Sequence, residues 1–472
     1  MPKLRRYVAT QALPASPMSA FDYHERPGAL NRLIPPWETV TIESSDRSLK
    51  PGSRVVLKTS VGGVPLRWVA EHTEYNPPNL FADRQISGPF ETWNHQHRFE
   101  TRERANSDHP SQLIDQIDYR LPLGALGDFF GSVKARRTIE AMFAYRHQIT
   151  HDDLRLMHDY PLNHLRVAVS GSNGLVGKAF CNLLNLFGHE VRSIVRGDQQ
   201  ESNQEAPWSR NADQHTLSGL DAVVHLAGKS IADGRWNQTQ KAEIRDSRVE
   251  KTRQLCELLA TKKQPPKVLV CASATGIYGD RGDEILDEQS PLGESTANGA
   301  GFLAQVGKEW EEACQPARDA GIRVVHARFG IILSPRGGAL QKMLTPAKLM
   351  GGSLGSGKQW WSWIGLDDAL GALYHCIQCE QVHGAVNLVT PSPIQNRDFT
   401  RELGRVIGRP ALFPAPKPIL RLGLGEMADA LLLSSARVIP KKLMDSNYHF
   451  RFTDLGQLLR YSLGRNLKHS EA

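Results

Sequence analysis

The sequence lacks the long apolar runs that a membrane protein needs. No stretch approaches the roughly 18–20 consecutive apolar residues of a membrane-spanning helix. The first 17 residues carry basic side chains without the apolar core of a secretory signal. With 40% hydrophobic and 23% charged residues, the composition is that of an ordinary globular protein. We therefore expect no membrane span and a cytoplasmic location.

Dense blocks of basic residues are also missing, although the formal net charge is +7. Lysine and arginine are spread along the chain and cluster no further than pairs such as Arg136-Arg137 and Lys441-Lys442. Nucleic-acid binding needs a concentrated basic surface, so this distribution predicts no nucleic-acid partner. It favours, weakly, an anionic small ligand.

Cysteine is scarce: six occur, and none precedes residue 180. Cys376 and Cys379 form a single CxxC beside His375 and His383. A zinc site of this kind would need a second such pair, which the sequence does not have, and the stretch has the pattern of a helix. The sequence therefore predicts buried thiols, no disulfide framework and no metal site.

A length of 472 residues is too great for one ordinary core and predicts two or three domains. Residues 1–155 contain many short alternating runs, among them RVVLKTSV, VPLRWVAEH and LIDQIDYRL, punctuated by PG, GG and PP. These runs predict a meandering antiparallel sheet. A short helix is expected before the sheet and a longer amphipathic helix after it, which would cover one face.

This order, with YHERPGALNRLIPPWE, WVAEH, GPFETWNHQHRFE and DYRLPLG, resembles the START-like (SRPBCC, helix-grip) ligand-binding superfamily. The resemblance implies an α+β domain over 1–155 that holds an apolar small molecule between sheet and helix. Within it, His95 and His97 alternate with Trp93 and Phe99 and so share one strand face. Without a third ligand nearby, the two histidines favour a cavity-lining or hydrogen-bonding role over a metal pair.

A polar, proline-containing stretch over 151–164 predicts a domain boundary. After it, apolar strands such as LRVAVS, DAVVHLAG, KVLVCAS and RVVHARFG alternate with helical stretches. This alternation is typical of a doubly wound parallel α/β sheet, a Rossmann fold, which we place at 163–400. Residues 401–466 are predicted to form a small helical C-terminal domain.

The most informative motif is the glycine-rich turn in LRVAVSGSNGLVGKAF. It lies between a predicted strand at 165–169 and an amphipathic helix, inside a βαβ unit. Glycines there permit a tight turn and a close approach of backbone N–H groups to a pyrophosphate, which the helix N-terminus also favours. The predicted cofactor-binding residues of this turn are Gly171, Ser172, Asn173, Gly174, Leu175, Val176 and Gly177.

The choice of dinucleotide is predicted from Arg196, at the end of the next strand. An acidic side chain there would bind the adenosine ribose, whereas arginine pairs well with a 2′-phosphate. NADP(H) is therefore favoured over NAD(H), although Asp198 lies two residues further on. The small residues that end the strand DAVVHLAG are predicted to lie beside the adenosine ribose and pyrophosphate: Leu226, Ala227 and Gly228.

From residue 165 to about residue 400 the chain resembles the extended short-chain dehydrogenase/reductases, the sugar-nucleotide epimerase and dehydratase group. The resemblance rests on the GxxGxxG turn, on CASATGIYG, on LDEQSPLG and on GIRVVHARFGIILSPRGG. The motifs SIADGRW, RDSRVEKT, GFLAQVGKEWE, GGSLGSGKQWWSWI and NRDFTRELGR match, more narrowly, an epimerase-like subgroup of unassigned substrate. GEMADALLLSSARVIPKKLMD resembles the small C-terminal domain of that subgroup.

The resemblance implies a serine that orients the substrate, a tyrosine that passes a proton, and a lysine four residues later that binds the nicotinamide ribose. Ser273 and Lys308 match the serine and the lysine, but Ala304 stands where the tyrosine is expected. Tyr278 is the only phenol in the motif and the candidate for a catalytic replacement, although packing at the strand end is favoured over catalysis as its role. The other candidates are Thr275, Asp280 and a proton relay through water or the substrate.

Together these features predict an NADP(H)-dependent oxidoreductase or epimerase that acts on an unidentified small molecule, which the START-like domain would bind or deliver. The alternative is a dinucleotide-binding redox sensor or regulatory protein without turnover, which Ala304 keeps open. The sequence identifies neither the substrate nor the direction of the reaction, and it leaves the oligomeric state open.

Overall fold

The computed structural model describes residues 3–61, 63–102, 109–122, 124–160, 163–196, 205–208, 217–293 and 301–465. Two compact units emerge from the contacts within the chain. The first takes in Met1–Asn163 with two short stretches, Asn185–Gly188 and Arg460–Ala472, and the second takes in His164–Leu184 and His189–Leu459. Among the described residues, no helix combines the length and the apolar content that crossing a bilayer requires.

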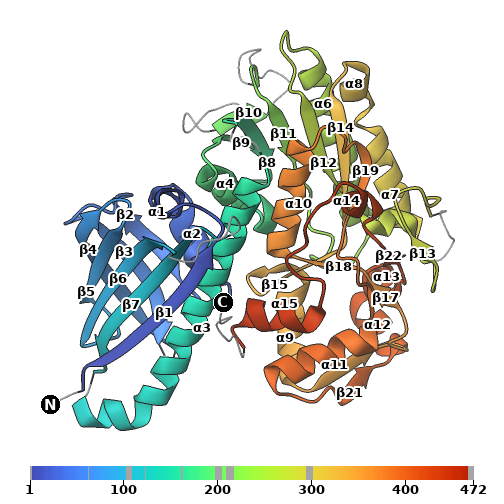
Figure 1. Ribbon diagram of the computed structural model, residues 1–472. Helices are drawn as coiled ribbons and strands as arrows, with labels where there is room; N and C mark the ends of the chain where they lie inside the picture. The colour runs from blue at the N-terminus through green and yellow to red at the C-terminus, as the bar shows by residue number, and fades with distance from the viewer. Residues whose placement is uncertain are drawn as a thin grey trace. The chain divides into compact units, whose positions relative to one another are not determined.

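The first unit is an antiparallel sheet that grips a long helix (Figure 1). Its seven strands lie in the order β1-β7-β6-β5-β4-β3-β2. The strands are β1 (Arg5–Leu13), β2 (Thr41–Ser45), β3 (Arg54–Val61), β4 (Val64–Asn76), β5 (Leu80–Ser87), β6 (Thr92–Thr101) and β7 (Ser111–Arg120). Between β1 and β2 the chain forms α1 (Pro17–Glu25) and α2 (Ala29–Leu33), and after β7 it forms α3 (Gly124–His158).

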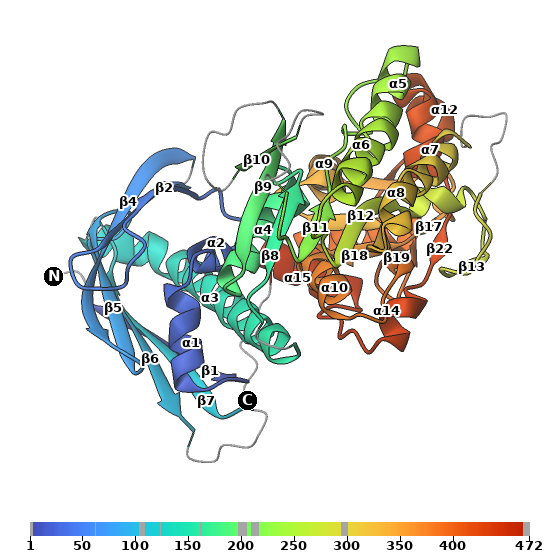
Figure 2. The ribbon, with the colours of Figure 1, turned by 90° about the horizontal axis from the view of Figure 1, so that it is seen from above.

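The alternation along β6 and β7 explains why α3 packs on this sheet. Every second side chain of β7 is buried, as a strand with one covered face requires. On that face Trp93, Ile117 and Tyr119 form a hydrophobic cluster with Ile139 and Phe143 of α3. Figure 2 shows the sheet curving around α1 and α3. The predicted helix-grip fold is confirmed.

A buried ion pair joins α2 to α3 within this unit. Asp153 of α3 accepts two hydrogen bonds from the Arg32 guanidinium, at 2.9 and 2.7 Å, and a third from the Tyr23 hydroxyl at 3.1 Å. The side chains of Arg32 and Asp153 are 6% and 0% exposed. Because both charges are removed from water, each depends on the other for compensation.

The second unit contains the predicted parallel sheet, which is confirmed. Its seven strands are all parallel and lie in the order β10-β9-β8-β11-β12-β14-β19. The strands are β8 (Arg166–Ser170), β9 (Glu190–Arg196), β10 (Glu205–Trp208), β11 (Ala222–His225), β12 (Val268–Ala274), β14 (Arg323–Phe329) and β19 (Gly384–Leu388). All four residues of β11 are buried, because helices cover both faces of the sheet.

Helices on the two faces of the second sheet place the functional elements. Figure 2 shows α6 and α7 on one face and α10 on the other. The helices are α4 (Leu175–Leu186), α5 (Gln238–Asp246), α6 (Val249–Ala260), α7 (Gly301–Glu312), α8 (Gln315–Asp319), α9 (Gly338–Lys348), α10 (Leu366–Gln378) and α11 (Asn396–Ile407). The turn η1 (Thr275–Tyr278) follows β12 directly.

The C-terminal part consists of short helices and two small strands that pair back onto the second unit. These strands, β21 (Phe413–Ala415) and β22 (Arg437–Val438), pair with β16 (Gly351–Leu354) and β13 (Ile285–Leu286). Its helices are α12 (Lys417–Leu424), α13 (Glu426–Ala428), η2 (Asp429–Leu433), α14 (Lys441–Asp445) and α15 (Leu455–Leu463). Three further short strands are β15 (Ile331–Ser334), β17 (Trp360–Trp361) and β18 (Trp363–Gly365), and β20 (Ile394–Gln395) pairs with β17.

The buried ion pair gives a first prediction. Asp153→Asn should destabilise the first unit by about 3–5 kcal/mol, because it leaves the Arg32 guanidinium buried without a counter-charge. Tyr23→Phe removes one neutral donor and should cost only about 1 kcal/mol. Urea unfolding followed by circular dichroism measures both, with the exposed Asp159→Asn as the control. Equal losses from Asp153→Asn and Asp159→Asn would contradict the prediction.

Candidate functional site

The glycine-rich turn follows β8, at the switch point of the second sheet. β8 lies between β9 and β11 in the sheet. The connection from β8 leads to β9 on one side and the later connection leads to β11 on the other, so a crevice opens beyond the carboxyl end of β8. Gly171 has a φ of +71°, and a Cβ there would lie 2.9 Å from the backbone nitrogen of Ala227. A Cβ on Gly177 would lie 2.2 Å from the carbonyl oxygen of Gly171. The turn therefore presents bare backbone at the start of α4, which fits a pyrophosphate.

A buried hydrogen-bond chain fixes the turn after β11 beside the turn after β8. The Ser170 hydroxyl lies 2.6 Å from His225 Nδ1 and accepts hydrogen bonds from the backbone N–H groups of residues 226 and 227. His225 Nε2 lies 3.0 Å from the Thr252 hydroxyl. Burial lowers the pKa of His225 to about 4, so its neutral ring accepts on one side and donates on the other. The predicted residues Leu226–Gly228 are thereby held next to Gly171.

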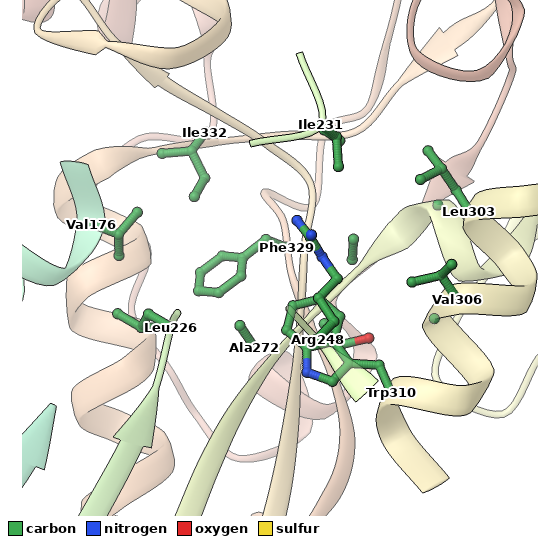
Figure 3. Close-up of a pocket in the computed structure, with 14 residues that line it drawn as sticks. Val176, Leu226, Ile231, Arg248, Ala272, Leu303, Val306, Trp310, Phe329 and Ile332 are labelled. Atoms are coloured by element: carbon green, nitrogen blue, oxygen red, sulfur yellow. The ribbon is translucent and has the colours of Figure 1, made fainter. Parts of the chain in front are cut away.

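A largely apolar cavity of about 220 Å³ lies beyond the ends of β11, β12 and β14. Figure 3 shows Val176 and Leu226 on one side of it and Leu303 and Val306 of α7 on the other. The lining residues are Val176, Leu226, Ile231, Arg248, Ala272, Ser273, Ala274, Gly276, Leu303, Val306, Gly307, Trp310, Phe329 and Ile332. Two of them belong to the predicted cofactor turns, so the cavity adjoins the predicted dinucleotide site.

Arg248 brings a positive charge to this cavity. Its guanidinium carbon lies 5.2 Å from the centre of the Trp310 ring, and its Nη1 donates to the Ile244 carbonyl at 3.1 Å. Burial lowers the pKa of Arg248 to about 10, so the side chain is still charged at neutral pH. Within the described ranges no carboxylate pairs with it. Because a half-buried charge without an ionic partner has a desolvation cost, Arg248 is a candidate for binding an anionic ligand group.

Ser273 begins a buried polar network at the end of β12. Its hydroxyl donates to Glu311 Oε1 at 2.8 Å, and Glu311 forms a two-point ion pair with Arg328, with both N–O distances 2.7 Å. Burial would raise the pKa of Glu311, but Arg328 outweighs it and holds that pKa below its usual value. Since Ser273 donates to an ionised carboxylate, the lone pairs of its oxygen can accept a hydrogen bond from a ligand hydroxyl.

Tyr278 lies at the other end of the same network and is fully buried. Its hydroxyl accepts from Arg328 Nη1 at 2.9 Å and donates to Asn387 Oδ1 at 2.8 Å. Burial raises the pKa of Tyr278, although the neighbouring guanidinium opposes the shift. Tyr278 is not among the described residues that line the cavity. The structure thus brings Ser273 to the cavity and leaves Tyr278 behind Arg328 and Glu311.

The other predicted positions lie on α7 and at the end of β9. Ala304 is fully buried, and Lys308 is half-buried on the side of α7 next to the one that lines the cavity. The Lys308 ammonium has no hydrogen bond or ion pair with another described residue. Arg196 ends β9, but its side chain lies outside the described part of the structure, and so does the whole of Asp198.

Three charged residues of this site were not predicted from the sequence: Arg248, Glu311 and Arg328. Arg248 lies in RDSRVEKT, which served only as a family motif. Glu311 lies in the predicted helix that contains GKEWEE, and Arg328 lies in RVVHARFG, which served only as a predicted strand. A usable signal was Arg328 near the end of β14, a strand in the middle of the predicted sheet, because a buried arginine needs a carboxylate partner.

Three family models match the chain: one covers most of the helix-grip unit, one covers the parallel-sheet unit and one covers the C-terminal part. Residues 13–143 match the family described as polyketide cyclase / dehydrase and lipid transport. Residues 167–388 match the NAD dependent epimerase/dehydratase family, and residues 415–461 match a domain of unknown function (DUF1731). These matches confirm the resemblances to START-like proteins and to extended short-chain dehydrogenase/reductases.

Similar proteins extend these matches. The epimerase family protein Mb2239 of Mycobacterium bovis is 39% identical over 303 residues, 63% of this chain and 98% of that protein. The crystal structure of human epimerase family protein SDR39U1 (isoform 2) with NADPH is 33% identical, covers 63% of this chain and 99% of that one, and has a TM-score of 0.58. The crystal structure of the nucleoside-diphosphate sugar epimerase from Corynebacterium glutamicum is 32% identical with a TM-score of 0.78, over 97% of this chain and 90% of that one. The chain therefore belongs to the epimerase family of the extended short-chain dehydrogenase/reductases, with a START-like domain at its N-terminus.

Proposed function

We propose that this protein is an NADP(H)-dependent oxidoreductase or epimerase that acts on a small molecule. The observation that carries the proposal is the bare backbone cradle at Gly171 and Gly177, which opens next to a cavity that Ser273 and Arg248 line. The similar human protein was solved with NADPH, which supports the same cofactor here. When bound, the nicotinamide would take or give a hydride.

The predicted cofactor-binding residues have distinct roles in this proposal. The turn from Gly171 to Gly177 binds the pyrophosphate, Leu226–Gly228 lie along the adenosine ribose, and Lys308 holds the nicotinamide ribose. Arg196 binds the 2′-phosphate that distinguishes NADP(H) from NAD(H). Arg248, the half-buried cation of the cavity, binds an anionic group of the cofactor or of the substrate.

The catalytic role falls to Ser273, with Glu311 and Tyr278 acting through their neighbours. Ser273 accepts a hydrogen bond from the substrate hydroxyl, because its own proton is directed at Glu311. In oxidation the hydroxyl proton would pass to the Ser273 oxygen while the serine proton passes to Glu311, and in carbonyl reduction the same protons would move in reverse. Glu311 keeps that orientation fixed and is itself held by Arg328. Tyr278 is a positioning residue, since both of its hydrogen bonds are internal.

The apolar walls of the cavity favour an apolar or ring-shaped substrate over a highly charged one. The helix-grip unit matches a family whose description includes lipid transport. We infer that it binds an apolar small molecule and serves as a reservoir for the substrate. The second candidate function is a redox sensor that binds the dinucleotide without turnover, and Ala304, in place of the usual tyrosine, favours it.

The backbone cradle can be tested at Gly177. Gly177→Ala places a Cβ 2.2 Å from the Gly171 carbonyl oxygen, so α4 must move away from the turn and NADPH affinity should fall at least about tenfold. The matched control is Gly423→Ala, because a Cβ there meets nothing within 4 Å. Fluorescence titration with NADPH measures both variants. An unchanged affinity in a folded Gly177→Ala protein would refute the cradle.

Cofactor choice can be tested at Arg196. Arg196→Asp should weaken NADPH binding by about tenfold or more, since a charge-assisted hydrogen bond to the 2′-phosphate is worth about 1.5–3 kcal/mol. NADH lacks that phosphate and serves as the internal control, so its affinity should stay the same or rise. Parallel calorimetric titrations give the ratio of NADPH affinity to NADH affinity. If this ratio is the same in Arg196→Asp and in the wild-type protein, Arg196 does not bind the 2′-phosphate.

Turnover separates the enzyme from the sensor. Purified protein with NADPH is assayed for cofactor oxidation against a panel of apolar ketones, aldehydes and sugar nucleotides. For the enzyme, Ser273→Ala should lower kcat by about 10²-fold. Tyr278→Phe should lower kcat less than about tenfold and leave the pH profile in place. Tight NADPH binding without oxidation across the panel would instead establish the sensor.

A further inference from the structure

The interior of the helix-grip unit contains a cluster of buried and half-buried acidic and histidine side chains that the proposed reaction does not use. Asp83 lies on β5, His95 and His97 on β6, and Asp115 on β7, which are adjacent strands. In the sheet register Asp83 is paired with His95, and His97 with Asp115. Cross-strand pairs share a face, and Asp115 contacts His147 of α3. The cluster therefore lies on the face of the sheet that α3 covers.

Three of these side chains have the spacing of ligands to one ion. Asp83 Oδ2 lies 3.3 Å from His95 Nδ1 and 3.8 Å from His97 Nε2. One ligand atom from each of the three residues falls within 4.8 Å of the other two. Donor atoms bonded to a tetrahedral Zn²⁺ at about 2.0–2.1 Å lie roughly 3.3 Å from one another. Little movement is needed for the three to bind one metal ion.

Asp115 lies on the opposite side of both imidazole rings. Its Oδ1 is 3.0 Å from His95 Nε2 and 2.6 Å from His97 Nδ1. Each histidine thus directs one ring nitrogen at Asp83 and the other at Asp115. A metal-bound histidine almost always donates its second ring N–H to a carboxylate or a carbonyl, which fixes the tautomer and the ring orientation. His147 Nε2, 2.5 Å from Asp115 Oδ2, holds that carboxylate in place.

The cluster is incomplete as a purely hydrogen-bonded network. His97 is 8% exposed, and its buried Nδ1 has no well-aligned hydrogen bond despite its distance to Asp115.

We propose that Asp83, His95 and His97 bind a divalent transition-metal ion in the helix-grip unit, with Asp115 as the residue that orients both histidines. Two imidazoles and one carboxylate suit Zn²⁺ or Fe²⁺, whereas Ca²⁺ and Mg²⁺ prefer oxygen ligands alone. Three protein ligands leave a coordination position for water or a bound molecule. The proposal departs from the expectation of no metal site, because the fold brings Asp83 from β5 to histidines that lacked a third ligand in the sequence.

Cobalt binding tests the site on the full-length protein. The protein is stripped with EDTA, dialysed and titrated with Co²⁺ while visible absorption is recorded. We expect about one Co²⁺ per chain with the d–d bands of a low-symmetry, nitrogen- and oxygen-ligated ion, displaced by Zn²⁺. Asp83→Asn and His97→Ala should abolish the bands. Asp115→Asn should keep them and weaken affinity by about 10–100-fold, as outer-shell substitutions do.

Two controls keep the test decisive. His158→Ala changes an exposed histidine at the end of α3 and should leave Co²⁺ binding unchanged. Binding at Cys376 and Cys379 would instead give sulfur-to-cobalt charge-transfer bands in the near ultraviolet. The proposal is overturned if the wild-type protein shows no d–d bands or shows thiolate bands alone. It is also overturned if a folded Asp83→Asn variant binds Co²⁺ with the same affinity as the wild-type protein. The wild-type titration decides the question even where a variant fails to fold.

Discussion

The contact between the first turn of α4 and the loop after β8 is the constraint on which the site depends. A helix can approach a strand end this closely only where no side chain intervenes, and Gly177 lies where even a methyl group would overlap the carbonyl of Gly171. That approach determines where the amide groups point and how far the turn after β11 lies from them. The Ser170–His225 hydrogen bond then fixes the second turn against the first.

Behind this turn, and apart from Arg248 in the cavity wall, buried polar side chains are concentrated in two hydrogen-bonded chains. One chain runs from Ser170 to Thr252, and the other from Ser273 through Glu311 and Arg328 to Tyr278 and Asn387. In both chains each side chain is hydrogen-bonded to the next, which fixes the orientation of each side chain. Ser273 is the point at which the second chain reaches the cavity. A binding space with apolar walls can thus present one well-oriented hydroxyl.

The sequence predicted those features that are encoded locally. Strand and helix periodicity identified both folds, and the glycine spacing identified the turn, because each depends on residues adjacent in the chain. It missed the pairing of Glu311 with Arg328, since those residues come from separate elements and meet only after the sheet forms. The same reason explains Asp83, which is 12 positions before His95 in the chain and its direct neighbour across β5 and β6. Tyr278 was named as a catalytic candidate by residue type, with packing favoured as its role, but its hydrogen-bond partners Arg328 and Asn387 come from separate strands and could not be predicted.

The cation at Arg248 has a consequence for how this protein evolves. A guanidinium kept beside an apolar cavity with no carboxylate in the described surroundings lowers the stability of the ligand-free fold. Selection for stability alone would replace it with an apolar side chain, and selection for ligand binding would retain it. A position of this kind marks a trade-off between stability and activity. Charged positions at which an apolar substitution increases the stability of this fold would therefore be candidates for ligand-binding residues.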